Sequence, residues 1–125
     1  MANWREWLTD GEKYLKTAGG QSKAARFNTA YQYNVIAIAL ESFAMAILDY
    51  HGKLPDNHTF TDLIEALQTV IGLPDDLREK ILEHEQTQKI CSFTDYTRTE
   101  PTTEEINDFR DAVKKIGTIA RNVCV

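Results

Sequence analysis

The feature that most constrains this chain is an apolar, alanine-rich stretch from Val35 to Leu48. Its apolar side chains cover more than one face of a helix instead of forming a single stripe. A helix of this kind is stable when neighbouring helices cover it from several sides, and its alanines let those neighbours approach closely. The stretch therefore predicts the central helix of a helical bundle. We expect this helix to begin near Ser22, a good N-cap, and to end at His51-Gly52.

Four further segments place apolar residues at helical spacing. The first is residues 3–18, where Gly11 interrupts the pattern. The third helix of the chain is expected to begin near Thr59. The fourth opens at Pro74, because proline and the acids that follow it belong in a first turn. The fifth runs to the C-terminus and has the most regular spacing of all.

The C-terminal third also contains the least regular part of the chain. Residues 83–89 are polar on nearly every face, so the fourth helix is expected to be marginal at its end. Residues 92–103 are expected to form an ordered loop. Thr102-x-x-Glu105 is a capping box that opens the last helix. Since no segment alternates as a strand would, the predicted fold class is all-α. We expect a single domain, residues 1–125, folded as an antiparallel up-and-down bundle of about five helices.

The charge of the chain limits its function. The formal net charge is −5 and the pI is near 5.1. These values argue against a protein that wraps nucleic acid along its whole surface. The charge is uneven, however, because residues 1–26 carry a balance of +2. Their basic residues form either a local basic patch or the solvated face of the first helix. They are Arg5, Lys13, Lys16, Lys23 and Arg26.

Three observations bear on the compartment. Cys91 and Cys124 are the only cysteines, which fits a reducing environment better than a disulfide framework. The first five residues have no signal-peptide pattern. The longest apolar run, Val35–Leu40, is too short to span a bilayer. We therefore expect a cytoplasmic protein.

Four segments share, in order along the chain, a pattern with one known family. They are Trp7–Leu15, the alanine-rich run Ala37–Leu48 with its embedded Glu41, the loop and helix start His51–Leu67, and Tyr96–Pro101. Together they resemble the HEPN domain, a helical module named for higher eukaryotes and prokaryotes nucleotide-binding. Two positions depart from the family pattern. Met45 stands where a lysine is frequent, and Thr99-Glu100 replaces an aromatic residue.

The resemblance implies a helical module that binds without catalysing. It implies either pairing with a nucleotidyltransferase-type partner or holding a nucleotide or another small anion in a groove between helices. A concave basic pocket would favour the second. One alternative is an RNA-cleaving HEPN toxin of a toxin–antitoxin pair. Another is an unrelated helical protein–protein interaction domain. We also expect a homodimer that buries part of the first or last helix, because two tryptophans near the N-terminus exceed what one thin bundle face readily hides.

The ribonuclease alternative depends on Arg78 and His84, which resemble a catalytic pair of the family. A histidine could move the proton of a ribose 2′-hydroxyl while an arginine holds the charged phosphorane. The motif lacks the Asn after the arginine and the Tyr after the histidine that mark the active form. A six-residue step also places the two side chains on different faces of a helix. We interpret the segment as a solvated helix surface, crowded by Glu79, Glu83 and Glu85.

Four residues are candidates for binding: Glu41, His58, Tyr96 and Arg98. Glu41 lies in an apolar run, so we expect it to be mostly buried and to need a hydrogen-bond donor, for which Arg98 is the natural candidate. Facing outward, Arg98 could instead clamp a phosphate. No metal site is expected, because His51 and His58 lack a third ligand. No phosphate loop, nucleophile elbow or zinc motif indicates a cofactor.

Overall fold

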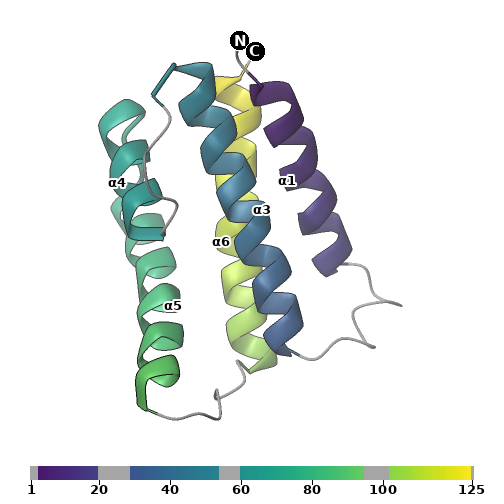
Figure 1. Ribbon diagram of the computed structural model, residues 1–125, viewed down its shortest axis with the longest axis vertical. Helices are drawn as coiled ribbons and strands as arrows, with labels where there is room; N and C mark the ends of the chain where they lie inside the picture. The colour runs from purple at the N-terminus through teal and green to yellow at the C-terminus, as the bar shows by residue number, and fades with distance from the viewer. Residues whose placement is uncertain (1–2, 20–28, 54–59, 95–101, 125) are drawn as a thin grey trace.

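The computed structural model describes residues 3–19, 29–53, 60–94 and 102–124. Within these residues it contains five α-helices and no strands, so the predicted all-α class is confirmed. The central helices α3 and α6 have α1 on one side and α4 and α5 on the other (Figure 1). The helices are α1 (Trp4–Gly19), α3 (Thr29–Tyr50), α4 (Phe60–Val70), α5 (Asp75–Thr94) and α6 (Thr103–Val123).

Helix α3 is enclosed by its neighbours, as its apolar faces predict. Between Phe43 and Leu48 every side chain is buried. By length and composition Gln32–Tyr50 would suffice to cross a membrane, a span that the short run Val35–Leu40 did not suggest. In the bundle 72% of that span is buried, which is the environment of a core helix. The apolar character of α3 is therefore used for packing against α1, α4 and α6.

The two central helices run parallel, and α1 runs antiparallel to both (Figure 1). Three contacts connect α3 and α6 in the same order along both helices. The rings of Tyr33 and Phe109 stack with centroids 4.9 Å apart, and Phe43 packs against Gly117. The Cys124 thiol lies 3.5 Å from the Ala46 carbonyl. The expectation of antiparallel neighbours does not extend to this pair. The reason is topological, because α4 and α5 return the chain to the starting end of α3 before α6 begins.

Phe43 explains why a glycine interrupts the first helix. A Cβ atom at Gly11 would lie 2.7 Å from the Phe43 ring, and one at Gly117 would lie 2.9 Å from it. Both distances are too short for a carbon–carbon contact, so the ring occupies the space of two missing side chains. Gly11 thus costs helix propensity but permits close packing. The two glycines bring α1 and α6 together at one level of the bundle.

Two predicted helix ends have the expected capping geometry. Gly52, at φ 68°, follows α3, and the Lys53 amide donates to the Leu48 carbonyl at 2.7 Å. This is the glycine-ended pattern that satisfies the last carbonyls of a helix. At the start of α6 the capping box is formed: the Glu105 amide donates to Thr102 Oγ1 at 3.1 Å, and the Thr102 amide donates to Glu105 Oε1 at 3.0 Å.

Helix α5 differs from its prediction. It continues to Thr94, so it includes residues 83–89 and the first part of the segment 92–103 that we expected to be a loop. Among the described side chains, α5 packs against α6 through the rings of His84 and Phe109. The predicted helix starts at Ser22 and Thr59 fall outside the described residues.

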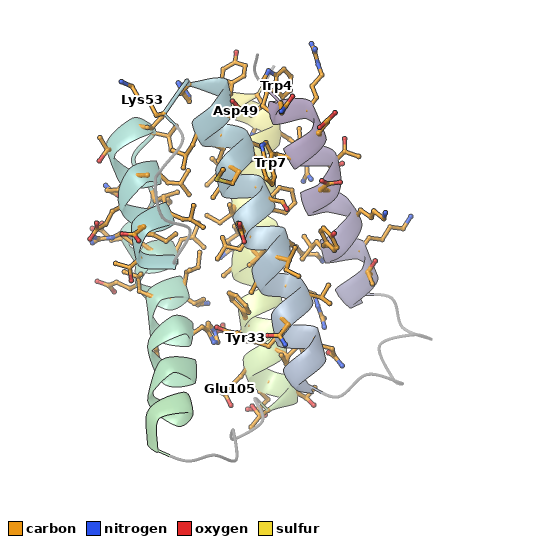
Figure 2. All side chains as sticks on the ribbon, in the orientation of Figure 1. Trp4, Trp7, Tyr33, Asp49, Lys53 and Glu105 are labelled. Atoms are coloured by element: carbon orange, nitrogen blue, oxygen red, sulfur yellow. The ribbon has the colours of Figure 1, made fainter. Side chains whose placement is uncertain are left out.

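The tryptophans near the N-terminus are partly covered within the monomer. Trp7 packs against the core, and Trp4 meets Tyr50 edge-on with centroids 5.4 Å apart. Trp4 lies beside Asp49 at one end of the bundle, where the Asn3 amide donates to the Asp49 carboxylate (Figure 2). The aromatic surface left for a second copy is therefore smaller than the sequence suggested, and the homodimer stays a prediction.

Candidate anion-binding groove

A groove of about 450 Å³ lies between α1 and α6. Four of its six lining residues are basic and one is acidic, so the lining carries a net charge of +3 in a chain whose formal net charge is −5. A concave surface of one sign focuses the electric field and raises the local concentration of counter-ions. The lining residues are Glu12, Leu15, Lys16, Arg110, Lys114 and Arg121.

The basic residues of α6 form one stripe because of their spacing. At about 100° per residue, steps of four and eleven bring Lys114 and Arg121 to within about 40° of Arg110 around the helix axis. The stripe is about 16 Å long, from the rise of about 1.5 Å per residue. It faces α1, while the acidic side chains of Asp108 and Asp111 point elsewhere, toward Lys80 on α5.

The antiparallel register of α1 and α6 places Lys16 opposite the middle of this stripe. Glu12 on α1 contacts Arg121 on α6. One turn further along α1 is Lys16, and about two turns back along α6 is Lys114. Lys16, Lys114 and Arg110 therefore lie beyond the Glu12–Arg121 pair along the groove, and Glu12 is the one acid among the described lining residues.

The other end of the groove contains an ion pair. Arg121 Nη1 lies 3.2 Å from Glu12 Oε1, and Arg121 Nη2 donates to Thr118 Oγ1 at 3.3 Å. Both charged side chains are about half exposed. Arg110 donates through Nη1 to Asn107 Oδ1 at 3.1 Å, while its buried Nε has no acceptor among the described residues. Guanidinium and ammonium groups in this arrangement can bind phosphate oxygens, with Leu15 as an apolar wall.

The opposite flank of α6 contacts His84 of α5, one of the two candidate catalytic residues. His84 Nε2 lies 3.0 Å from Asp108 Oδ2, and Lys80 Nζ lies 2.9 Å from Asp108 Oδ1. The hydrogen bonds and charges of Lys80 and His84 lower the pKa of Asp108 below its usual 3.8, against the effect of burial. The Asp108 hydrogen bond and charge raise the pKa of Lys80. The His84 ring also packs on Phe109, with centroids 5.1 Å apart.

These contacts correct the interpretation of His84 as part of a solvated surface. Only 13% of its side chain is exposed. Arg78, six residues earlier, is partly exposed and contacts Asp75 on its own helix at 3.5 Å. The two side chains thus have separate partners, as their six-residue spacing requires. One ring nitrogen of His84 is engaged in holding α5 against α6.

Glu41 lies at the edge of the buried face of α3. Its side chain is only partly exposed, and it has an interaction partner. The apolar Ile38, one turn earlier, is 44% exposed. Arg98, the expected donor to Glu41, and the binding candidate Tyr96 lie outside the described residues, so the predicted pairing is not tested.

The remaining candidate, His58, also lies outside the described residues, so its predicted role is not tested. His51, at the end of α3, lines a second hollow with Lys53 and α4 residues. Among the residues that the structure describes, no group of three or more His, Cys, Asp and Glu side chains could hold a metal ion. Of the basic residues near the N-terminus that the structure describes, which are Arg5, Lys13 and Lys16, only Lys16 lines the α1–α6 groove.

Sequence reasoning missed the α6 part of the groove. Arg110, Lys114 and Arg121 lie among the polar positions of an amphipathic helix. Their shared position around the helix axis can be calculated from the sequence, but the sequence does not show which helix lies beside that stripe. No protein-family model, curated protein or solved structure matches this chain. The resemblance to HEPN domains therefore rests on the sequence motifs alone.

Proposed function

We propose that this chain is a non-catalytic, HEPN-like helical module of the cytoplasm that binds a small phosphate-bearing anion of nucleotide type. The groove between α1 and α6 is the observation that supports the proposal. Its lining combines a net charge of +3, a concave shape and a neighbouring apolar side chain, Leu15. Phosphate groups pair with clustered arginines and lysines, and a base or sugar can rest on apolar surface.

The size of the basic surface favours a small ligand. The cations gather in one hollow of about 450 Å³, within the range of small-molecule sites. Elsewhere the chain is acidic overall, since its formal net charge is −5 despite this lining. A long nucleic acid bound in the groove would meet that acidic surface at its ends. A mononucleotide or a pyrophosphate group would not.

The contacts of His84 weigh against the ribonuclease alternative. A catalytic histidine needs a ring nitrogen within reach of the ribose hydroxyl and an arginine close to the same phosphate. His84 instead has Nε2 on Asp108 and its ring against Phe109, while Arg78 contacts Asp75. We therefore expect no cleavage of single-stranded RNA by the purified protein. Robust cleavage that His84→Ala abolishes would establish the alternative.

Isothermal titration calorimetry with ATP, AMP and pyrophosphate tests the binding proposal directly. We expect Lys114→Gln to weaken pyrophosphate binding about three- to tenfold, from the Coulomb energy of one cation against a dianion across about 6 Å of screened solvent. Lys115→Gln is the matched control, because it removes the same charge from the next residue. Lys115 lies beside Asp76 in a different hollow, between α5 and α6.

Two outcomes would replace the proposal. Equal losses in the Lys114→Gln and Lys115→Gln variants would indicate a general charge effect without a site. Absence of heat at millimolar concentrations of all three ligands would reject the small anion. In that case co-purification with a nucleotidyltransferase-type protein would support the partner-binding role that the HEPN resemblance implies.

A further inference from the structure

The acidic residue in the groove lining is placed where it competes with a ligand. Glu12 Oε1 lies 3.2 Å from Arg121 Nη1. Carboxylates and phosphates use the same donors of a guanidinium group. While this ion pair is formed, one of the four cations of the lining is neutralised by the protein itself.

The ion pair contributes little to folding, which leaves it free to open. The two side chains are 50% and 45% exposed, and ion pairs with this exposure contribute little to stability. Arg121 also keeps a second contact, with Thr118 Oγ1 at 3.3 Å, that holds its guanidinium near the groove. A ligand can therefore displace Glu12 from Arg121 at small cost and find the guanidinium already in place.

From this geometry we infer that Glu12 is a built-in counter-ion that lowers the affinity of the groove and is displaced from Arg121 when a phosphate ligand binds. The inference rests on the proposed function, because it assigns a regulatory residue to the same site. It also defines the ligand more closely. The phosphate must carry enough charge to displace a carboxylate, which favours a pyrophosphate group over a singly charged anion.

The test compares two variants that remove one negative charge from α1. Glu12→Gln removes the competing carboxylate and keeps the length of the side chain. Glu6→Gln is the matched control, since Glu6 is exposed, lies about 9 Å away along the same helix and is not part of the groove. We expect Glu12→Gln to tighten pyrophosphate binding about three- to tenfold in calorimetry, and Glu6→Gln to change it less than twofold.

A double-mutant cycle with Arg121→Gln separates the specific contact from general electrostatics. If Glu12 acts by occupying Arg121, the gain from Glu12→Gln falls to about twofold or less in the Arg121→Gln background at 0.15 M salt. An undiminished gain would overturn the competition for Arg121. A melting temperature that Glu12→Gln leaves unchanged would show that the variant is folded normally.

The possible outcomes distinguish this inference from the proposed function. If the wild-type protein binds pyrophosphate and Glu12→Gln binds it equally or more weakly, Glu12 is a structural bridge and the inference is wrong, while the binding function stands. If only Glu12→Gln binds pyrophosphate, the blocking role of Glu12 is supported, while the proposed binding of this ligand by the wild-type chain fails. If neither protein binds pyrophosphate at millimolar concentration, the proposed function fails and the inference fails with it.

Discussion

The two flanks of α6 use charge in opposite ways. Toward α5, the carboxylate of Asp108 is shared between Lys80 and His84, so both signs meet within 3.0 Å. Toward α1, Lys114 and Arg110 line a groove in which Glu12, the one acid among the described lining residues, pairs with Arg121. Both flanks belong to one amphipathic helix, and both lie at its polar margin.

This contrast distinguishes charges that stabilise the fold from charges that are candidates for binding a ligand. Paired groups compensate each other and hold helices together, and their pKa values shift in the directions that favour the pair. Cations that lie close together repel one another, so a cluster of them in a groove slightly lowers the stability of the fold. A cost of that kind is expected where a ligand supplies the missing charge. Three changes of decreasing size test this distinction.

The largest effect is expected from Phe109→Ala on the α5 flank. Phe109 is fully buried and contacts Tyr33 and His84. Its removal should lower the free energy of unfolding by about 3–5 kcal/mol, measured by urea denaturation. On the groove flank, Leu15→Ala should cost only about 1 kcal/mol because Leu15 is partly buried. Equal losses at the two sites would contradict the division into a structural flank and a binding flank.

A smaller effect is expected from Asp108→Asn, which breaks the shared carboxylate. Because Asp108 is about half exposed, we expect a loss of about 0.5–1 kcal/mol at neutral pH. The pKa of Asp108 in the folded chain lies below 3.8, so the unfolded chain takes up the proton first as the pH falls. The stabilisation is therefore present above the ordinary pKa and is lost as the pH drops through the lowered one.

Thermal denaturation as a function of pH checks this sign. The melting temperatures of wild type and Asp108→Asn should differ at pH 7 and converge well below pH 3.8. On the alkaline side, the Lys80 contribution should be lost only above its ordinary pKa of 10.5, because its folded-state pKa is raised. A constant difference across the acidic range would mean that the Asp108 charge does not stabilise the fold.

The sequence predicted the fold better than the site, for a physical reason. The central position of α3 follows from apolar faces, and the start of α6 follows from the local hydrogen bonds of Thr102 and Glu105. Both are properties of one segment. The groove depends on two helices that are distant in sequence, and the register of Glu12 against Arg121 is set by packing around Phe43.

His84 shows the same limit from the other side. Its polar neighbours in sequence indicated a solvated surface, yet its ring is covered by Phe109, 25 residues later. Local polarity could not reveal that partner, because the core-facing residues of α5, such as Leu77 and Ile81, are sparse among polar ones. For Glu41, the apolar neighbourhood in sequence agrees with a side chain that is only partly exposed.

The smallest effect is expected from Lys114→Gln on stability, and it has the opposite sign to Asp108→Asn. Lys114 shares the groove lining with Lys16 and Arg110, and Glu12, the one acid among the described lining residues, is paired with Arg121, so removing the Lys114 charge relieves repulsion. The free energy of unfolding should stay equal or rise by less than about 0.5 kcal/mol, and any rise should vanish in 1 M salt, where the Debye length is about 3 Å. A clear destabilisation would show that Lys114 is held by a structural pair, and the groove flank would then resemble the α5 flank. Unchanged stability together with weakened pyrophosphate binding is the combination that a binding charge requires, because only the bound state then depends on the cation.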